Sequence, residues 1–343
     1  MLITFVDDLV PFDGCSAELV PLGGPEKGLI ALAVGLARRG HTDRVFNRCD
    51  RSVVADGVSW RPIKECDAAY SDWLIAHRNP TLLRHVPNAD RTALWMVGDA
   101  TYLGNSSPLS AITDRKSVLV LQSLAQSLTV PKSLQANAAE VVVPAALDCY
   151  RTAPEMLPST PAHAVVTTHP ANCLDWLLGI WLDHVFTRIP TAELHIYSST
   201  LERGAAGGDL PTSLRPLLAR ALAGRRKGVK LFRPLSDNKM SEVYRRARVH
   251  LYPSDERDLL CTTLGDSQAV GLPAVARDKG AARERLLHGQ SGYLAPNAED
   301  FADLTVRLLG EDVIFTKLCR IARTRQRKRD WDQVAADFER VLA

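Results

Sequence analysis

The sequence of 343 residues lacks any apolar run close to the roughly 20 residues that a transmembrane helix needs. Its formal net charge of +3 is too small to indicate a nucleic-acid partner. The first residues, MLITFVDDLVPFDG, carry acid where a signal peptide carries base, so we expect them to begin a core strand. These features predict a soluble globular protein.

Several common chemical motifs are also missing. The seven cysteines are odd in number and scattered without a CxxC pair, which indicates reduced thiols and excludes a disulfide framework or a structural zinc site. No P-loop, HExxH or GxSxG motif occurs, and no group of His and Cys has the spacing of metal ligands. The predicted location is therefore cytoplasmic, and the chemistries of these motifs are set aside.

Short apolar strands alternate with helical patterns along the whole sequence, and the length fits two domains of about 150 residues. Such alternation predicts an α/β fold with two doubly wound, Rossmann-like sheets. Ligands of these sheets bind outside the carboxyl ends of the strands, so two facing domains would enclose an inter-domain cleft. The expected strands are Leu2–Val6, Thr42–Asn47, Trp73–Ala76, Thr92–Met96, Ser117–Gln122, Glu140–Pro144, Ala164–Thr168, Glu193–Tyr197, Val229–Phe232, Val249–Tyr252 and Ala274–Ala276.

The clearest domain boundary is the segment CYRTAPEMLPSTPA, which has three prolines and no clear periodicity. We expect an N-terminal domain over residues 1–148, a linker over 149–162, a C-terminal domain over 163–329 and an amphipathic helix over 330–343. A basic run, Arg320–Arg329, precedes this helix. A solvated helix face is the first interpretation of the run, and peripheral contact with anionic lipid at the inner membrane face is the alternative.

Two N-terminal features suit a ligand site. Gly23 and Gly24 precede a helical pattern, and paired glycines before a helix expose backbone N–H groups that attract an anion. A tight turn without a ligand is the alternative. His77 follows an apolar strand, so it would reach a ligand hydroxyl or phosphate from the carboxyl end of that strand, unless the next turn satisfies the imidazole.

The C-terminal half holds the strongest pattern. Asp258 and Asp266 stand eight residues apart and bracket a run rich in small residues, before a Gly-x-Pro turn and an apolar strand. This order suits a polyhydroxylated, phosphorylated ligand, because a carboxylate accepts several hydroxyl protons. The alternatives are a solvated loop acid at Asp258 and a helix N-cap at Asp266, and Glu256 competes for the first position.

These motifs resemble the retaining nucleotide-sugar glycosyltransferases of GT-B fold in glycosyltransferase family 4 (glycosyl transferases group 1). The resemblance rests on LGGPEKGLIALAVGLARRGH, on the acid–x7–acid region and on the terminal helix, so it covers nearly the whole chain. Most members carry glutamates where this chain has aspartates. The resemblance implies that Asp258 contacts the hydroxyls of the donor sugar, and that Asp266, at the start of a helix, accepts hydrogen bonds from the ribose.

The family usually places an Arg, often with a Lys close behind, in the loop after the first strand of the donor domain, to bind the donor diphosphate. Here no Arg or Lys occurs between Arg151 and Arg188. His169 and Asn172 are the polar candidates in this loop, and the candidates to replace the missing charge are Arg233 and Lys239.

The implied reaction transfers a sugar from a nucleotide diphosphate sugar to an acceptor hydroxyl with retained configuration, without a metal or other cofactor, in glycan or glycoconjugate synthesis. The catalytic candidates are Asp258 and His77. The donor-binding candidates are Gly23, Gly24, His169, Asn172, Arg233, Leu260, Cys261, Thr262, Thr263 and Asp266. The alternatives are an inactive or weak GT-B pseudo-enzyme that binds a nucleotide or glycan, which the missing basic residues favour, and a nucleotide-sugar epimerase.

Overall fold

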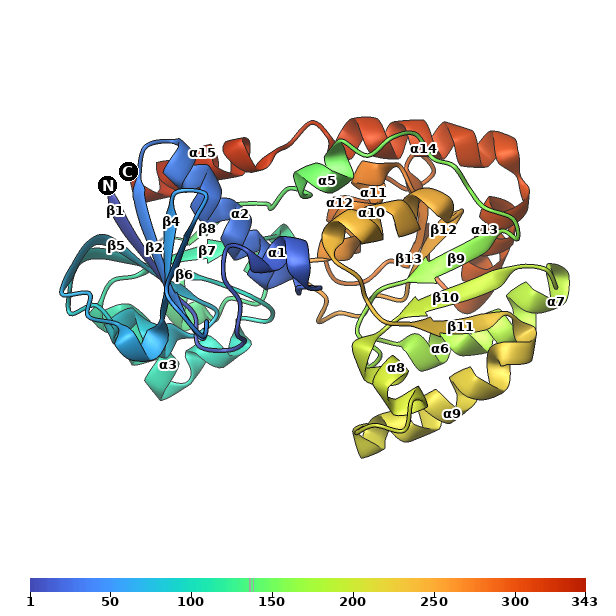
Figure 1. Ribbon diagram of the computed structural model, residues 1–343, viewed down its shortest axis with the longest axis horizontal. Helices are drawn as coiled ribbons and strands as arrows, with labels where there is room; N and C mark the ends of the chain where they lie inside the picture. Colours follow the sequence, from blue (N-terminus) through green and yellow to red (C-terminus); the bar gives the residue numbers. More distant parts are fainter. Residues whose placement is uncertain (136, 138) are drawn as a thin grey trace. The chain divides into compact units, whose positions relative to one another are not determined.

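The computed structural model describes residues 1–135, 137 and 139–343. The chain divides into two compact units (Figure 1): the first holds residues 1–145 and 329–343, and the second holds residues 146–328. Each unit is built on one sheet of mostly parallel strands with helices on both faces, which confirms the predicted class of two Rossmann-like α/β domains. Residues 149–162, expected as a linker, lie within the second unit, where the N–H groups of Leu157 and Ser159 donate to the carbonyls of Arg245 and Arg246.

The first sheet has the strand order β3-β4-β2-β1-β5-β6-β7-β8. Its strands are β1 (Leu2–Val6), β2 (Thr42–Asn47), β3 (Val53–Ala55), β4 (Val58–Pro62), β5 (Tyr70–His77), β6 (Asn88–Trp95), β7 (Val118–Leu121) and β8 (Ala139–Val141). The strand order reverses between β1 and β5, so their carboxyl ends form the switch point where ligands of such sheets bind. Only β3 and β4 pair antiparallel in the described part of this sheet, and neither was predicted.

Side chains alternate between the two faces of the first sheet, because successive residues of a strand point to opposite sides. Leu74 and Leu94 pack on one face with η2 (Pro80–Arg84) and α3 (Ser106–Asp114). On the other face Trp73 Nε1 donates to the carbonyl of Leu342 at 2.9 Å. The short helices are α1 (Ser16–Leu19), η1 (Ile63–Glu65), η3 (Thr101–Gly104), α4 (Leu124–Ser127) and η4 (Lys132–Leu134).

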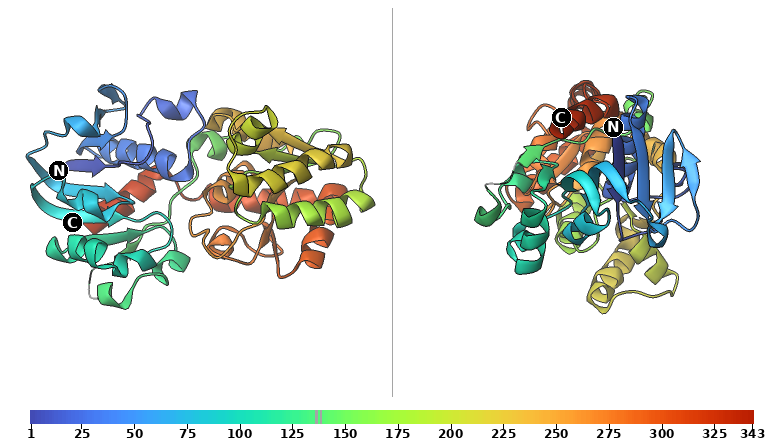
Figure 2. Two further views of the ribbon diagram at one scale, coloured as in Figure 1. Left: turned by 90° about the horizontal axis from the view of Figure 1, so that it is seen from below. Right: turned by 90° about the vertical axis from the view of Figure 1, so that its left-hand side faces the viewer.

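The C-terminal helix α15 (Trp331–Leu342) belongs to the first unit and packs along α2 (Gly24–Arg38). Figure 2 shows both helices in this unit, together with the two ends of the chain. Phe338 meets the Trp95 ring edge-on, with 5.6 Å between ring centroids. The apolar face of the last helix therefore completes the core of the unit in which the chain begins.

The second sheet has the order β11-β10-β9-β12-β13-β14, and all its pairs are parallel. Its strands are β9 (His163–Val166), β10 (Glu193–Tyr197), β11 (Val229–Phe232), β12 (Val249–Tyr252), β13 (Ala274–Arg277) and β14 (Gly292–Ala295). Numbered within the unit, this is the Rossmann order 3-2-1-4-5-6. The switch point therefore lies between β9 and β12. Every predicted strand is present, and β14 was not predicted.

Two hydrophobic cores lie on the two faces of the second sheet. Ala164 and Val166 of β9 pack with α6, α9 and α13, whereas Val165 packs with α5, α10 and α11. The helices are α5 (Asp148–Arg151), α6 (Leu174–Ile180), η5 (Trp181–Val185), α7 (Phe186–Arg188), α8 (Ser199–Ala205), η6 (Thr212–Leu214), α9 (Arg215–Ala223), η7 (Gly224–Lys227), α10 (Asp237–Arg246), α11 (Thr262–Val270), α12 (Ala282–Arg285), α13 (Ala298–Gly310) and α14 (Asp312–Gln326).

Candidate functional site

A buried charged cluster occupies the switch point of the first sheet. Asp7 follows β1, and its Oδ2 lies 2.6 Å from His77 Nδ1 and 2.8 Å from Arg78 Nε. Arg78 also binds Glu26 of α2, with 2.7 Å between Nη2 and Oε1. Arg78 has φ +59, a left-handed conformation that costs a non-glycine residue free energy and is held here by its two ion pairs. The cluster thus ties the ends of β1 and β5 to the first turn of α2.

His77 is neutral in this cluster. Burial lowers its pKa by more than the hydrogen bond with Asp7 raises it. Burial opposes ionisation of Asp7, but the hydrogen bond with His77 and the charge of Arg78 hold its pKa below the ordinary value. The imidazole therefore donates Nδ1–H to the carboxylate. Its Nε2 is buried without a hydrogen-bond partner among the residues that the structure describes, so that nitrogen keeps its lone pair.

The paired glycines stand where they were expected, at the start of α2. Gly23 is the N-cap and Gly24 the first helical residue. A Cβ on Gly23 would lie 2.3 Å from Glu26 Oε2, so the end of the Glu26 side chain, whose Oε1 pairs with Arg78, would have to shift. A side chain at position 23 would therefore disturb the charged cluster, whether or not a ligand binds there.

The loop after β9 is polar but satisfied in large part by itself. His169 is exposed, and its Nδ1 accepts a hydrogen bond of 3.2 Å from the N–H of Ala171. The N–H of Asn172 donates to the carbonyl of His169 at 2.8 Å. Thr168 is different, because its Oγ1 is buried and has no partner in the described part of the chain.

Asp258 is oriented by the residues around it. Its Oδ2 accepts a 2.7 Å hydrogen bond from the Tyr252 hydroxyl, and its Oδ1 accepts one of 3.1 Å from the N–H of Cys261. Burial raises the pKa of Tyr252 far above the ordinary value, and the charge of Asp258 and its hydrogen bond with the hydroxyl act in the same direction, so the tyrosine remains a donor. A carboxylate offers about four acceptor positions, which leaves about two for a ligand.

The expected place of Asp266 at a helix start is wrong. Helix α11 begins at Thr262 with Cys261 as its N-cap, so Asp266 is the fifth helical residue and neither starts nor caps the helix. The residue is 2% exposed. Burial raises the pKa of Tyr150, and the charge of Asp266 raises it further. Burial lowers the pKa of Arg285, and the charge of Asp266 acts against this lowering. The contact of Asp266 with the ribose stays a prediction. In the structure the Asp266 side chain has charged and polar neighbours within the second unit.

The remaining donor-binding candidates of this region precede or occupy the first turn of α11. The backbone N–H groups in the first turn of a helix have no partner within the helix, so they are available to a ligand. The N–H of Cys261 already donates to Asp258, which leaves three of the four candidates for a phosphate. These three are Leu260, Thr262 and Thr263, and each is half-buried.

The suggested substitutes for the missing charge lie elsewhere. Arg233 follows β11, three strands from β12, which corresponds to about 14 Å at the usual strand spacing. Its side chain is 71% exposed and pairs with Glu202. Lys239 is exposed on α10. Glu256, the rival of Asp258, is exposed and pairs with Lys279 at 2.8 Å. Among the described residues, no contact joins Arg233, Lys239 or Glu256 to the Asp258 carboxylate.

Arg277 was missed because the predicted strand ended one residue too early. It is the last residue of β13, the neighbour of β12. Its guanidinium lies 4.8 Å from the centre of the Trp176 ring, and Nη1 lies 3.1 Å from Cys173 Sγ. An arginine at the carboxyl end of an apolar strand was the available sequence signal.

The basic run 320–329 is not a solvated helix face, so that interpretation was wrong. Its arginines donate mainly to backbone carbonyls of other segments: Arg323 to Ala153, Arg325 to Glu284 and Arg285, Arg327 to Ala153 and Ala269, and Arg329 to Val143. Arg320 and Lys328 are the exposed basic residues of the run. Contact with anionic lipid would therefore depend on these two side chains.

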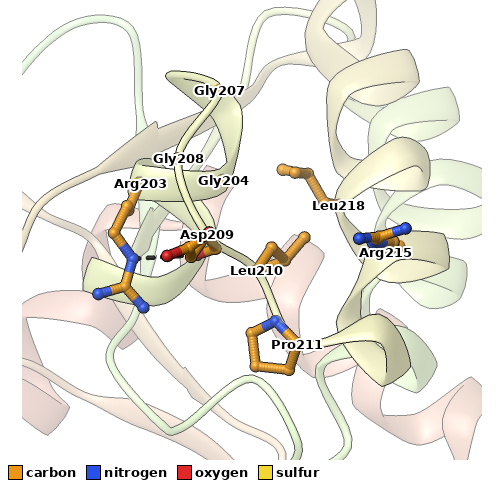
Figure 3. A pocket seen from close by; sticks show the side chains of 9 residues that line it. All are labelled: Arg203, Gly204, Gly207, Gly208, Asp209, Leu210, Pro211, Arg215 and Leu218. Carbon is orange, nitrogen blue, oxygen red and sulfur yellow. Dashed lines mark hydrogen bonds between the residues drawn. The ribbon is translucent and has the colours of Figure 1, made fainter.

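A cavity of about 720 Å³ lies in the second unit (Figure 3). It is formed by α8, α9 and the turn between them, and Arg203 Nε donates there to the carbonyl of Asp209 at 3.0 Å. It contains none of the predicted site residues. Across residues 1–135, 137 and 139–343, no three His, Cys, Asp or Glu side chains form a group that could hold a metal ion, and no helix is long and apolar enough to cross a membrane.

Comparison with known proteins links the second unit to one family. Residues 164–311 match the family model described as glycosyl transferases group 1. A D-inositol 3-phosphate glycosyltransferase of Xylanimonas cellulosilytica is 32% identical over 143 residues, which are 41% of this chain and 34% of that protein. The chain spans about a third of the length of the curated relatives it matches.

Solved structures match along the whole chain. The sucrose-phosphate synthase of Thermosynechococcus elongatus gives a TM-score of 0.74 at 12% identity, covering 99% of this chain and 97% of that one. The HepE protein of Anabaena, solved in complex with UDP and glucose, gives 0.70 at 15% identity, covering 100% and 99%. At these identities the likeness shows the fold, which is the two-domain GT-B architecture.

Proposed function

We propose that this protein is a retaining glycosyltransferase, which moves a sugar from a nucleotide diphosphate sugar to an acceptor hydroxyl in glycan or glycoconjugate synthesis. The observation that carries the proposal is the family match over residues 164–311. That segment contains the β9–β12 switch point and the whole acid–x7–acid region. The carboxyl ends of parallel strands at a switch point are where sheets of this order bind nucleotides.

On the donor side, Asp258 would accept hydrogen bonds from hydroxyls of the transferred sugar. Tyr252 and the N–H of Cys261 fix its carboxylate, so little ordering is needed when the donor binds. The first turn of α11 would direct the N–H groups of Thr262 and Thr263 at a phosphate, where the helix dipole also favours negative charge. Fixed donors of this kind stabilise a departing diphosphate electrostatically.

On the acceptor side, His77 Nε2 would accept a hydrogen bond from a hydroxyl of the acceptor, since Nδ1 is bonded to Asp7. The departing phosphate would take the acceptor proton, so the reaction needs no separate base. The proposed reaction uses no metal ion or other cofactor, and addition of a chelator should leave its rate unchanged.

The proposal is tested by calorimetric titration of the full chain with UDP, GDP, dTDP and ADP, followed by transfer assays with the matching sugar nucleotides. One diphosphate should bind at micromolar strength. Asp258→Asn should weaken the sugar nucleotide more than the bare diphosphate, because only the former carries the sugar hydroxyls. Asp255→Asn, which changes a neighbouring acid paired with Arg257, is the matched control. Absence of binding to all four diphosphates would refute the proposal.

A binding protein without turnover is the second candidate, because residues 152–187 contain neither Arg nor Lys. It would bind a nucleoside diphosphate but neither hydrolyse nor transfer the sugar over hours at high enzyme concentration. Turnover of the donor without any acceptor, with a changed sugar in the product, would instead indicate an epimerase.

A further inference from the structure

Arg277 has unused hydrogen-bond donors at the carboxyl end of β13. Nη1 donates to Cys173 Sγ at 3.1 Å and approaches the carbonyl of Ser254 at 3.4 Å. Within the described residues, Nε and Nη2 make no hydrogen bond and the guanidinium makes no ion pair. These two nitrogens form the side of the guanidinium that binds two oxygens of one phosphate or carboxylate at once.

The absence of a carboxylate partner distinguishes Arg277 from the basic residues nearby. Three of them are exposed and each binds an acid close in sequence or on the adjoining loop, so their charge is already balanced. These pairs are Arg257 with Asp255, Lys279 with Glu256, and Arg283 with Asp278. Arg277 is half-buried at the strand edge, and its charge acts on Asp255 and Glu256 without forming an ion pair with either.

The guanidinium is also held in place. It lies over the Trp176 ring at 4.8 Å, a cation–π contact that keeps the planar group in one orientation. Trp176 belongs to α6, and Cys173 is the N-cap of that helix. The segment after β9, which has no cation of its own, therefore positions the guanidinium of Arg277. Thr168 of the same loop adds a buried hydroxyl without a partner in the described residues.

We infer that Arg277 binds a phosphate group of the nucleotide diphosphate donor. This inference rests on the proposed function, and it assigns to β13 the cation that the loop after β9 lacks. The strand order supports it, because β13 adjoins β12, whose following loop carries Asp258. The two contacts of Arg277 Nη1, with Cys173 and with Ser254, bring the ends of β9, β12 and β13 together.

The test compares Arg277→Gln and Arg277→Lys with the wild-type chain. Calorimetry with pyrophosphate, UDP, GDP, dTDP and ADP should show binding weakened about 10- to 100-fold in the Gln variant, since a charge-assisted pair is lost. The Lys variant should keep part of the affinity, because it keeps the charge but loses the planar pair of donors. Arg188→Gln, at an exposed arginine that is already paired with Asp303, is the control and should bind as wild type does.

A second measurement needs no variant. Pyrophosphate bound at Arg277 should slow alkylation of Cys173 by iodoacetamide, because the anion would shield the sulfur from the reagent and offset the positive charge that favours the reactive thiolate. It should leave the exposed Cys15 unaffected. Mass spectrometry of the two peptides gives both rates in one sample. Equal rates for Cys173 with and without pyrophosphate would contradict the inference even if the Gln variant failed to fold.

The outcomes separate this inference from the proposed function. Wild-type binding of a nucleoside diphosphate that Arg277→Gln leaves unchanged would overturn the role of Arg277 and keep the transferase proposal. Failure of the wild-type chain to bind any of the four nucleotides would overturn both. Weaker binding of glucose 1-phosphate by the Gln variant, with nucleotide binding intact, would place the phosphate on the acceptor and overturn the donor assignment.

Discussion

The buried imidazole of His250 predicts that the second unit loses stability in mild acid. It lies on the central strand β12 and is completely buried. Its Nδ1 is 2.7 Å from Ser267 Oγ and its Nε2 is 3.1 Å from Thr167 Oγ1, while the rings of Tyr244 and Tyr252 face it at 5.6 and 5.4 Å. Burial lowers the pKa of this imidazole from 6.5 to about 3.

The lowered pKa fixes the sign of the effect. The unfolded chain binds a proton at His250 from about pH 6.5 downward, whereas the folded chain does not until about pH 3. The stability from the neutral ring is therefore complete above pH 6.5 and falls as the pH falls towards 3. One proton bound only by the unfolded state lowers the free energy of unfolding by about 2 kcal/mol between pH 7 and pH 5. His163, whose pKa burial and the neighbouring His195 lower to about 4, acts in the same direction.

Amide hydrogen exchange of peptides from β9 and β12 measures this effect without interference from the first unit. We expect the wild-type protection, corrected for intrinsic exchange rates, to fall between pH 7 and pH 5. His250→Gln should be less stable at pH 7, yet lose about 2 kcal/mol less on acidification, because the titrating group is gone. His184→Gln, at an exposed position, is the control. An equal loss in wild type and His250→Gln would refute the reasoning.

Four other substitutions test the packing and hydrogen bonding around the candidate sites. A Cβ at Gly280, where φ is +55, would lie 2.2 Å from the carbonyl oxygen of Asp258, so Gly280→Ala should lower the free energy of unfolding by about 3 kcal/mol in urea titrations. Gly289→Ala, at φ +72 with no atom within 4 Å, should cost only about 1 kcal/mol. Phe338→Ala should destabilise the first unit by about 3–5 kcal/mol and leave hydrogen exchange in β12 unchanged. Tyr252→Phe removes the hydroxyl donor to Asp258, so it should weaken sugar-nucleotide binding several-fold in calorimetry at a stability cost of about 1 kcal/mol.

The fold was predictable where strands are buried on both faces. Ala164, Val165 and Val166 are completely buried, and such strands are short apolar runs that sequence alone reveals. The hairpin β3–β4 was missed although it carries a signal. Asp56 and Gly57 have φ +50 and +82, and an Asp-Gly pair between short runs with β-branched residues is typical of a tight hairpin turn. Strand β14 begins with a glycine and holds no β-branched residue, so its propensity is weak.

The candidate site was predictable only in outline. Asp258 follows a strand at the switch point, so its general position came from the strand order. The helix after it starts earlier than expected because Cys261 takes φ +49, a conformation that its residue type does not favour. The partners of Arg323 and Arg327 are backbone carbonyls from distant segments, and sequence spacing does not reveal such tertiary contacts.

The two switch points differ in charge, and the difference supports the proposed division of ligands between the units. In the first unit Asp7 and Glu26 bind the single guanidinium of Arg78, so the charge of this arginine is already balanced. The lone pair of His77 Nε2 in this cluster suits the proton of a neutral hydroxyl. In the second unit Arg277 has no acidic partner within the described residues. On these electrostatic grounds we expect an anionic donor at the second unit and a neutral acceptor hydroxyl at the first.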